Sequence, residues 1–311
     1  MPNVTTNGIQ IEYDTFGNPS SPPLLLIMGL GRQMIVWDEE FCNQFAGQGL
    51  YVIRFDNRDV GLSSKIYKDE VPNVMGVSDA LQRGETAKVP YTLDDMADDS
   101  IGLLDALGIE RAHVCGVSMG GMIAQIMAMR NPSRVWSLIS MLSSTGDPDL
   151  PTAKPEVIAL LMAPRPDKRD AYVEHMVNVF RTLAGPKIPI DEKLTRRLVE
   201  RSYDRCYYPQ GVAYHWAAVM AAGDRTQALK SISAPTLVIH GSDDPLIPVE
   251  CGKATTEAVP GAELLIIEGL GHSIPREARP RLMNAIVAHI KKQVIECGGQ
   301  LSIRYWIIPS Y

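Results

Sequence analysis

A serine flanked by glycines is the first residue whose surroundings could support chemistry. Ser118 lies in the segment Gly116-Val117-Ser118-Met119-Gly120, between an apolar run and a helical pattern. A serine presented on a sharp strand-to-helix turn needs residues without side chains two positions before and two positions after it. Gly116 and Gly120 meet that need. We therefore predict that Ser118 is a nucleophile, rather than part of a plain glycine-rich turn.

A serine hydroxyl reacts readily only when a neighbouring base removes its proton, and the base is usually a histidine. His272 stands in a loop, Gly269-Leu270-Gly271-His272, between the last apolar run and the last helical pattern. Such a loop can project a side chain across the top of a sheet, so we predict that His272 is the base. The other histidines fall in or beside expected helices and strands and are predicted to be structural: His113, His175, His215, His240 and His289.

Two adjacent aspartates are candidates for the carboxylate that orients the base. Asp243 and Asp244 follow another apolar run and precede Pro245. A proline disfavours the helical conformation of the residue before it, so Asp244 is expected in an extended loop. We favour Asp244 over Asp243, which otherwise suits a turn. The order serine, acid, histidine along the chain is that of α/β-hydrolases, not of chymotrypsin or subtilisin.

Two backbone N–H groups are expected to stabilise the charge on a carbonyl oxygen under attack. The Met119 N–H lies at the start of the helix that follows the serine. The Leu30 N–H lies in a glycine-containing loop that follows the apolar run at residues 24–28. A turn without a catalytic role is the alternative for the Leu30 loop. The charged loop at residues 56–61 could hold a phosphate or a metal, but an ion-paired brace is the favoured interpretation.

These residues need a scaffold, and the hydrophobic pattern predicts one. Short apolar runs, expected to be strands buried on both faces, cover residues 24–28, 51–55, 112–115, 137–142, 236–239 and 264–267. Helices are predicted from Leu93, capped by Thr92, to Gly108 and over 119–130 and 276–296. Asn7-Gly8 predicts a hairpin. Alternating strands and helices indicate an α/β fold with a mostly parallel sheet covered on both faces.

The alternation breaks at residues 145–230, which are rich in helical patterns. We predict a core formed by residues 1–144 and 231–297, a helical cap inserted at 145–230, and a C-terminal tail of unknown role at 298–311. Methionine- and tyrosine-rich parts of the cap suggest an apolar roof, made of Met162, Met176, Met220, Tyr203, Tyr207 and Tyr208. The three tyrosines, His215 and Trp216 could equally serve in packing of the cap or in lining the pocket.

Composition excludes several classes of partner. The net charge is −6 and the basic residues are scattered, so we expect no nucleic-acid partner. No long apolar run predicts a membrane span, and the first residues do not resemble a secretory signal. Five cysteines without metal-type spacing favour a cytoplasmic protein with free thiols. We expect neither a metal nor an organic cofactor; the oligomeric state is not predicted.

The motifs together resemble the α/β-hydrolase superfamily from Thr5 to about Val294. Within it, the chain is most similar to the bacterial esterase group that contains aclacinomycin methylesterase. The matching stretches are residues 24–29, 54–59, 116–120, 235–239, 244–248 and 269–272. The resemblance implies a mostly parallel sheet of the eight-stranded type and a helical cap. It also implies the triad Ser118, Asp244 and His272, with the backbone N–H groups of Leu30 and Met119 as oxyanion donors.

The predicted activity is hydrolysis of carboxylic esters of small to medium size through an acyl-enzyme intermediate. A lactonase, a C–C bond hydrolase and a cofactor-free haloperoxidase could use the same triad. A haloalkane dehalogenase or epoxide hydrolase is disfavoured, because these need a carboxylate where Ser118 stands. A slowly hydrolysing ligand receptor or a scaffold is the non-enzymatic alternative, since fold alone does not decide function.

Overall fold

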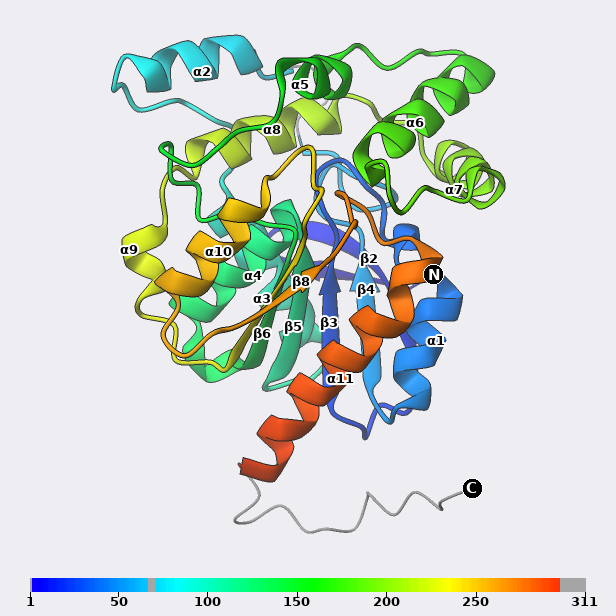
Figure 1. Cartoon of the computed structure of the whole chain (residues 1–311). Helices are drawn as coiled ribbons and strands as arrows, with labels where there is room; N and C mark the ends of the chain where they lie inside the picture. The colour runs from blue at the N-terminus through cyan, green and yellow to red at the C-terminus, as the bar shows by residue number, and fades with distance from the viewer. Residues whose placement is uncertain (1, 67–70, 297–311) are drawn as a thin grey trace.

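The computed structural model describes residues 2–66 and 71–296, and it is organised around one sheet (Figure 1). Within that part of the chain, eight strands lie in the order β1-β2-β4-β3-β5-β6-β7-β8. β1 pairs antiparallel with β2, and β2 with β4, whereas the remaining pairs are parallel. The strands are β1 (Asn3–Thr6), β2 (Ile9–Phe16), β3 (Pro23–Ile27), β4 (Tyr51–Phe55), β5 (Ala112–Val117), β6 (Val135–Met141), β7 (Thr236–Gly241) and β8 (Glu263–Ile267).

The sheet confirms the α/β-hydrolase fold that the apolar runs predicted. β3 and β5 are buried at every position, as expected for strands covered on both faces. The predicted hairpin joins β1 and β2. Its turn residues Asn7 and Gly8 have φ values of 48° and 75°, the left-handed conformations that a two-residue hairpin turn requires and that asparagine and glycine tolerate best.

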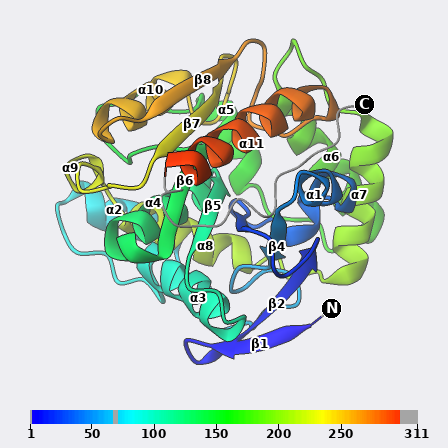
Figure 2. The same cartoon turned by 90° about the horizontal axis from the view of Figure 1, so that it is seen from below.

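Helices cover both faces of the sheet (Figure 2). One apolar core joins it to α3 (Leu93–Ala106) and α4 (Met119–Arg130), and a second joins it to α1 (Glu39–Gly47) and α11 (Arg279–Glu296). α10 (Val249–Ala258) lies between β7 and β8 in the sequence. The predicted helix from Leu93 is confirmed: Thr92 and Asp95 form a reciprocal capping box at its start, which satisfies N–H groups that the helix itself leaves free.

A group of helices lies above the sheet in Figure 1. Between β6 and β7 the chain forms α5 (Pro155–Met162), α6 (Arg169–Ala184), α7 (Glu192–Arg205), α8 (Gly211–Ala221) and α9 (Thr226–Leu229). The sequence did not predict α2 (Val74–Gln82), which lies at the same end of the molecule near α8. Its placement shows that a segment before β5 also contributes to the layer over the sheet. The predicted tail at 298–311 lies outside the described residues.

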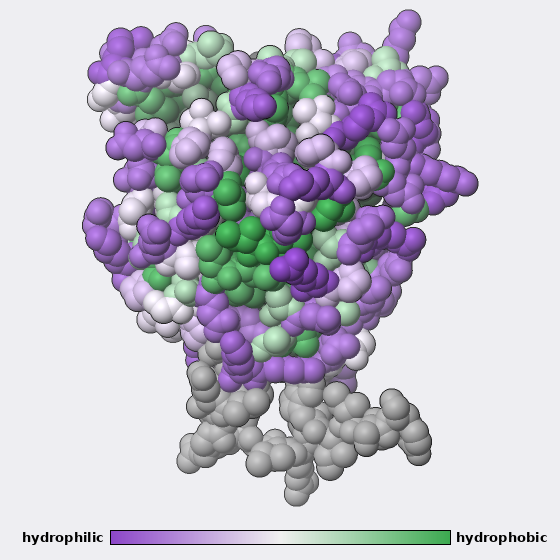
Figure 3. Space-filling view, in the orientation of Figure 1, coloured by the Kyte–Doolittle hydropathy of each residue, from purple (hydrophilic) through white to green (hydrophobic). Residues whose placement is uncertain are grey.

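The face seen in Figure 3 is mainly hydrophilic, with one apolar patch in its middle over the edge strand β8. Leu264 of β8 is among the exposed large hydrophobic side chains. Across the described residues, no helix has the length and apolar character needed to cross a bilayer. The described cysteines, Cys42, Cys115, Cys206 and Cys251, are free thiols.

Candidate active site

Ser118 occupies the sharp turn between β5 and α4. Its φ of 57° and ψ of −123° lie outside the ordinary allowed regions for a residue with a side chain. Several hydrogen bonds fix this conformation. The Ser118 N–H donates to the Met141 carbonyl oxygen at 2.8 Å, and its carbonyl oxygen accepts from the Gly121 N–H at 2.8 Å and from Ser143 Oγ at 2.9 Å. The strained turn is therefore held from the neighbouring strand β6 and from the loop after it.

The two glycines around Ser118 are required by lack of space. A Cβ atom on Gly116 would come within 2.0 Å of the Gly120 carbonyl oxygen, and one on Gly120 within 2.2 Å of the Ile27 carbonyl oxygen. Neither neighbour can move cheaply, because both are backbone atoms. The turn thus brings α4 against the end of β3, and this contact places the Met119 N–H beside the loop that contains Leu30.

His272 and Asp244 meet at the carboxyl ends of β7 and β8. His272 Nδ1 lies 2.7 Å from Asp244 Oδ2. The other oxygen, Oδ1, accepts the N–H groups of Leu246 and Ile247 at 2.9 and 2.8 Å. The Asp244 side chain is fully buried. Three hydrogen bonds therefore fix the carboxylate, which in turn orients the imidazole so that Nε2 is the nitrogen left for proton transfer.

Asp243 faces a different environment from its neighbour. Its Oδ1 accepts a hydrogen bond from Ser242 Oγ at 2.7 Å, and its Oδ2 lies 3.4 Å from Nζ of the exposed Lys187. Asp243 lies in the turn that follows β7, and Asp244 comes after that turn, so the two carboxylates have different partners. The structure brings Asp244, not Asp243, against this histidine.

The loop that carries Leu30 is held by the helices above it. The N–H of Gly31 donates to His215 Nδ1 at 3.0 Å, and His215 Nε2 lies 2.8 Å from the Arg58 carbonyl oxygen. Among the described residues, the N–H groups of Leu30 and Met119 have no hydrogen-bond partner. Two free donors beside one serine form the arrangement that an oxyanion hole needs. His215 was predicted to be structural, and its contact with this loop could not be seen in the sequence.

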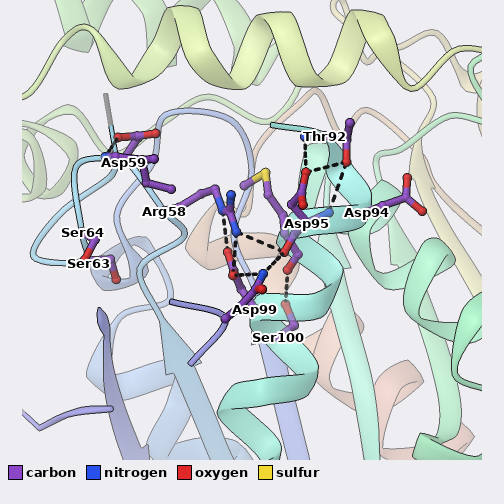
Figure 4. A network of polar contacts seen from close by, with 12 residues as sticks. Arg58, Asp59, Ser63, Ser64, Thr92, Asp94, Asp95, Asp99 and Ser100 are labelled. Carbon is purple, nitrogen blue, oxygen red and sulfur yellow. Dashed lines mark hydrogen bonds and ion pairs between the residues drawn. The ribbon is translucent and has the colours of Figure 1, made fainter. Parts of the chain in front are cut away.

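The charged loop after β4 is an ion-paired brace, as its sequence predicted: its side chains hold neighbouring segments in place. Arg58 makes a two-pronged ion pair with Asp99 at 2.6 and 2.7 Å, and Figure 4 shows this pair beside the capping box of α3. Asn57 donates to the Met28 carbonyl oxygen at 3.0 Å, directly before the Leu30 loop. Asp56 accepts the Met34 N–H and pairs with Arg205 at 2.6 Å. Within the described residues, no cluster of His, Cys, Asp and Glu suits a metal ion.

Ser118 and His272 face a common cavity of about 830 Å³, which Leu30 and Met119 also line. This volume is typical of small-molecule sites. The predicted roof of Met162, Met176, Met220, Tyr203, Tyr207 and Tyr208 is wrong, because none of these residues lines the cavity. Tyr203 and Tyr207 instead contact each other and Tyr172. The helices between β6 and β7 contribute Ile158, Leu161, Phe180, Leu183, Leu198, Trp216 and Val219.

The helix α6 also reaches the histidine loop. The His272 N–H donates to the Leu183 carbonyl oxygen at 2.6 Å. A Cβ atom on Gly271 would come within 2.2 Å of the Ala184 carbonyl oxygen. The glycine before His272 therefore allows close contact between this loop and the end of α6. The same helices that cover the cavity thus fix the backbone of both the histidine loop and the Leu30 loop.

Comparison with known proteins agrees with this geometry. Residues 22–277 match the family described as the alpha/beta hydrolase fold. The chain is 28% identical to the rhodomycin D methylesterase DauP of a Streptomyces species, over 94% of this chain and 98% of the relative. It is 27% identical to 3-oxoadipate enol-lactonase 2 of Acinetobacter baylyi, over 93% and 96%.

Solved structures show the same fold. A meta-cleavage product hydrolase from Pseudomonas fluorescens superposes with a TM-score of 0.72 at 20% identity, covering 94% of this chain and 98% of that one. The enol-lactonase of Burkholderia xenovorans gives 0.71 at 20% identity, covering 93% and 100%. The methylesterase similarity confirms the resemblance that the motifs indicated. With its sheet, its strained serine turn and the match over residues 22–277, the chain belongs to the alpha/beta hydrolase fold family.

Proposed function

We propose that this protein is a serine-dependent carboxylic-ester hydrolase with Ser118 as nucleophile, His272 as general base and Asp244 as the orienting acid. The observation that carries the proposal is the 2.7 Å contact between His272 Nδ1 and Asp244 Oδ2. His272 lines the same cavity as Ser118, which stands on its strained turn. The relatives support the enzyme class, since one is named a methylesterase and another an enol-lactonase, and both reactions open an ester bond.

In the proposed reaction, His272 Nε2 takes the proton from Ser118 Oγ as the oxygen attacks the ester carbonyl. The N–H groups of Leu30 and Met119 donate to the oxyanion of the tetrahedral intermediate. His272 then gives its proton to the leaving alcohol, which leaves an acyl-enzyme. A water molecule, deprotonated by His272, attacks the acyl carbonyl and releases the acid, and Ser118 regains its proton.

The cavity supports substrates of small to medium size. Its lining is largely aliphatic and aromatic, and burial of each methylene is worth roughly 0.8 kcal/mol. We expect kcat/KM to rise along a series of p-nitrophenyl esters from acetate and to fall once the chain outgrows the cavity, with an optimum at about two to eight acyl carbons. We further propose that residues 145–230 act as one cap over residues 1–144 and 231–297. A preference for palmitoyl esters, with activation at a lipid interface, would contradict the expected optimum for short acyl chains.

The deciding experiment combines kinetics with labelling of the nucleophile. Ser118→Ala should lower kcat for ester hydrolysis on the order of 10⁶-fold while circular dichroism shows an intact fold. A fluorophosphonate should add one label to the wild type, on the peptide that contains Ser118, and none to the variant. Ser143→Ala is a control for the identity of the nucleophile, because the Ser143 hydroxyl donates to the Ser118 carbonyl oxygen, and this variant should still be labelled. Activity of a folded Ser118→Ala protein at a tenth of the wild-type rate would refute the assignment.

The same preparation separates the alternatives. Lactones and vinylogous diketones test lactonase and C–C hydrolase activity, and added EDTA should leave every rate unchanged. Halide-dependent peroxidation would support a cofactor-free haloperoxidase. Turnover well below one per second on all substrates, together with tight ligand binding, would instead favour a receptor.

A further inference from the structure

Two partly buried arginines in the cavity have no acidic partner among the described residues. Arg32 follows the Leu30 loop, and Arg165 precedes α6; both line the same cavity as Ser118. Of the other four arginines that line it, three are paired with carboxylates: Arg201 with Glu39, Arg276 with Glu40 and Arg279 with Asp38. The fourth, Arg197, is exposed to solvent. Within the part of the chain that the structure describes, no carboxylate lies within ion-pair distance of Arg32 or Arg165.

The neighbours of these two guanidinium groups are neutral. Arg165 Nη1 lies 2.9 Å from His175 Nε2 and 3.0 Å from Met176 Sδ. Arg32 Nη1 lies 3.9 Å from the same sulfur, and Arg32 Cζ stands 4.4 Å from the centre of the Phe180 ring. The two positive charges thus share one sulfur neighbour.

The electrostatics of the pair reflect this lack of a counter-charge. Burial, followed by the charge of Arg165, lowers the pKa of Arg32 to about 10. Burial also lowers the pKa of Arg165, and burial together with both arginines lowers that of His175. A pair of like charges that are partly buried and have no counter-charge is unfavourable for the fold, so a role for it has to be sought in what the cavity binds.

We propose that Arg32 and Arg165 form an anion subsite that binds a carboxylate carried by the ester substrate. This inference rests on the proposed function, because it assigns the substrate class of the Ser118 site. Guanidinium groups suit a planar carboxylate, which can accept two hydrogen bonds from one fork. Arg32 lies only two residues beyond the oxyanion donor Leu30, so the subsite is close to the reacting carbonyl. The preferred substrates are therefore half-esters of dicarboxylic acids, with an apolar segment between the ester and the acid.

The first test compares mono-p-nitrophenyl adipate with p-nitrophenyl hexanoate, which has the same chain length and no charge. The ratio of kcat/KM for the two esters should favour adipate in the wild type. In Arg32→Gln and in Arg165→Gln it should fall about ten- to a hundred-fold, the range expected for one charge-assisted hydrogen bond. Arg197→Gln is the matched control, because Arg197 is an exposed arginine of the same cavity. An equal fall in Arg197→Gln, or no fall in either variant, would overturn the proposal.

The second test needs no catalysis. Free adipate should raise the melting temperature of Ser118→Ala but not that of Ser118→Ala with Arg32→Gln. Without adipate, the double variant should melt no lower than its parent, because it no longer holds two like charges near one another without a counter-charge. A lower melting temperature, with the adipate effect retained, would mean that Arg32 is structural and would refute the subsite. Because this test measures binding of adipate and not catalysis, its result does not depend on which residue is the nucleophile.

Discussion

His215 in α8 accepts a hydrogen bond from the Gly31 N–H although 184 positions separate the two residues. Burial lowers the pKa of His215 to about 4, so the ring is neutral at neutral pH. A neutral ring can accept at Nδ1 while its Nε2–H donates to the Arg58 carbonyl oxygen. The imidazole therefore joins α8, the Leu30 loop and the brace after β4, and it holds the Gly31 N–H directly after the proposed donor Leu30.

We predict that His215→Leu lowers kcat about ten- to a hundred-fold with little change in KM, because the Leu30 donor is no longer held in place. The affinity for an aryl boronic acid, which mimics the tetrahedral intermediate, should fall in parallel. His113→Leu is the matched control, since His113 is equally buried but pairs with Ser137 at the far end of β5. Equal losses of kcat in both variants would show that His215 acts only through stability.

The two adjacent aspartates provide a comparison within one loop. Asp244→Asn should lower kcat on the order of 10³-fold or more, since the amide no longer holds the tautomer of His272. Asp243→Asn should leave kcat nearly unchanged, because it loses only a contact with the exposed Lys187. Steady-state rates on one activated ester decide between them, and a reversed ranking would make Asp243 the orienting acid.

Much of the fold and of the candidate site could be predicted because the signals are local. The apolar run before Gly116 and the Asn7-Gly8 turn each depend on a few neighbouring residues. Pro245 indicated which aspartate stands in an extended loop, and the structure places Asp244 against His272.

The rest depends on contacts between distant segments. Nothing near His215 in the sequence shows that Gly31 donates to it. Nothing near Arg32 shows that α6 brings Phe180 against it, or that Arg165, before α6, lies close to it without an acid. For Tyr203 and Tyr207 the sequence left pocket lining and helix packing as alternatives, because residue type alone does not show which side of a helix meets the cavity. Packing of Tyr203 and Tyr207 against Tyr172 decides that question.

Gly116 offers a test of the serine turn. Gly116→Ala should lower the free energy of unfolding by about 1–3 kcal/mol or more, and should reduce kcat, since its Cβ would meet a backbone oxygen at 2.0 Å. Gly47→Ala is the control: a Cβ there meets nothing within 4 Å, at the end of α1. It should leave kcat unchanged and stabilise the fold by up to about 1 kcal/mol. Urea unfolding and steady-state kinetics measure both, and a neutral Gly116→Ala would contradict the packing.

The last prediction concerns stability in acid. Burial lowers the pKa of His113 from 6.5 to about 3 and that of His215 from 6.5 to about 4. Both folded-state values lie below the unfolded one, so the unfolded chain binds more protons below pH 6.5. The contribution of these neutral rings to the free energy of unfolding is therefore fully present above pH 6.5, and it is lost as the pH falls toward 3–4.

Each ring should contribute a loss of about 1 kcal/mol in the free energy of unfolding between roughly pH 7.5 and roughly pH 5.5. Urea midpoints at the two pH values measure the loss. His113→Leu removes one of the titrating groups, so its pH dependence should be smaller than that of the wild type by that amount, whatever its stability at neutral pH. An identical pH dependence in the wild type and His113→Leu would mean that the pKa of His113 is the same in the folded and the unfolded chain.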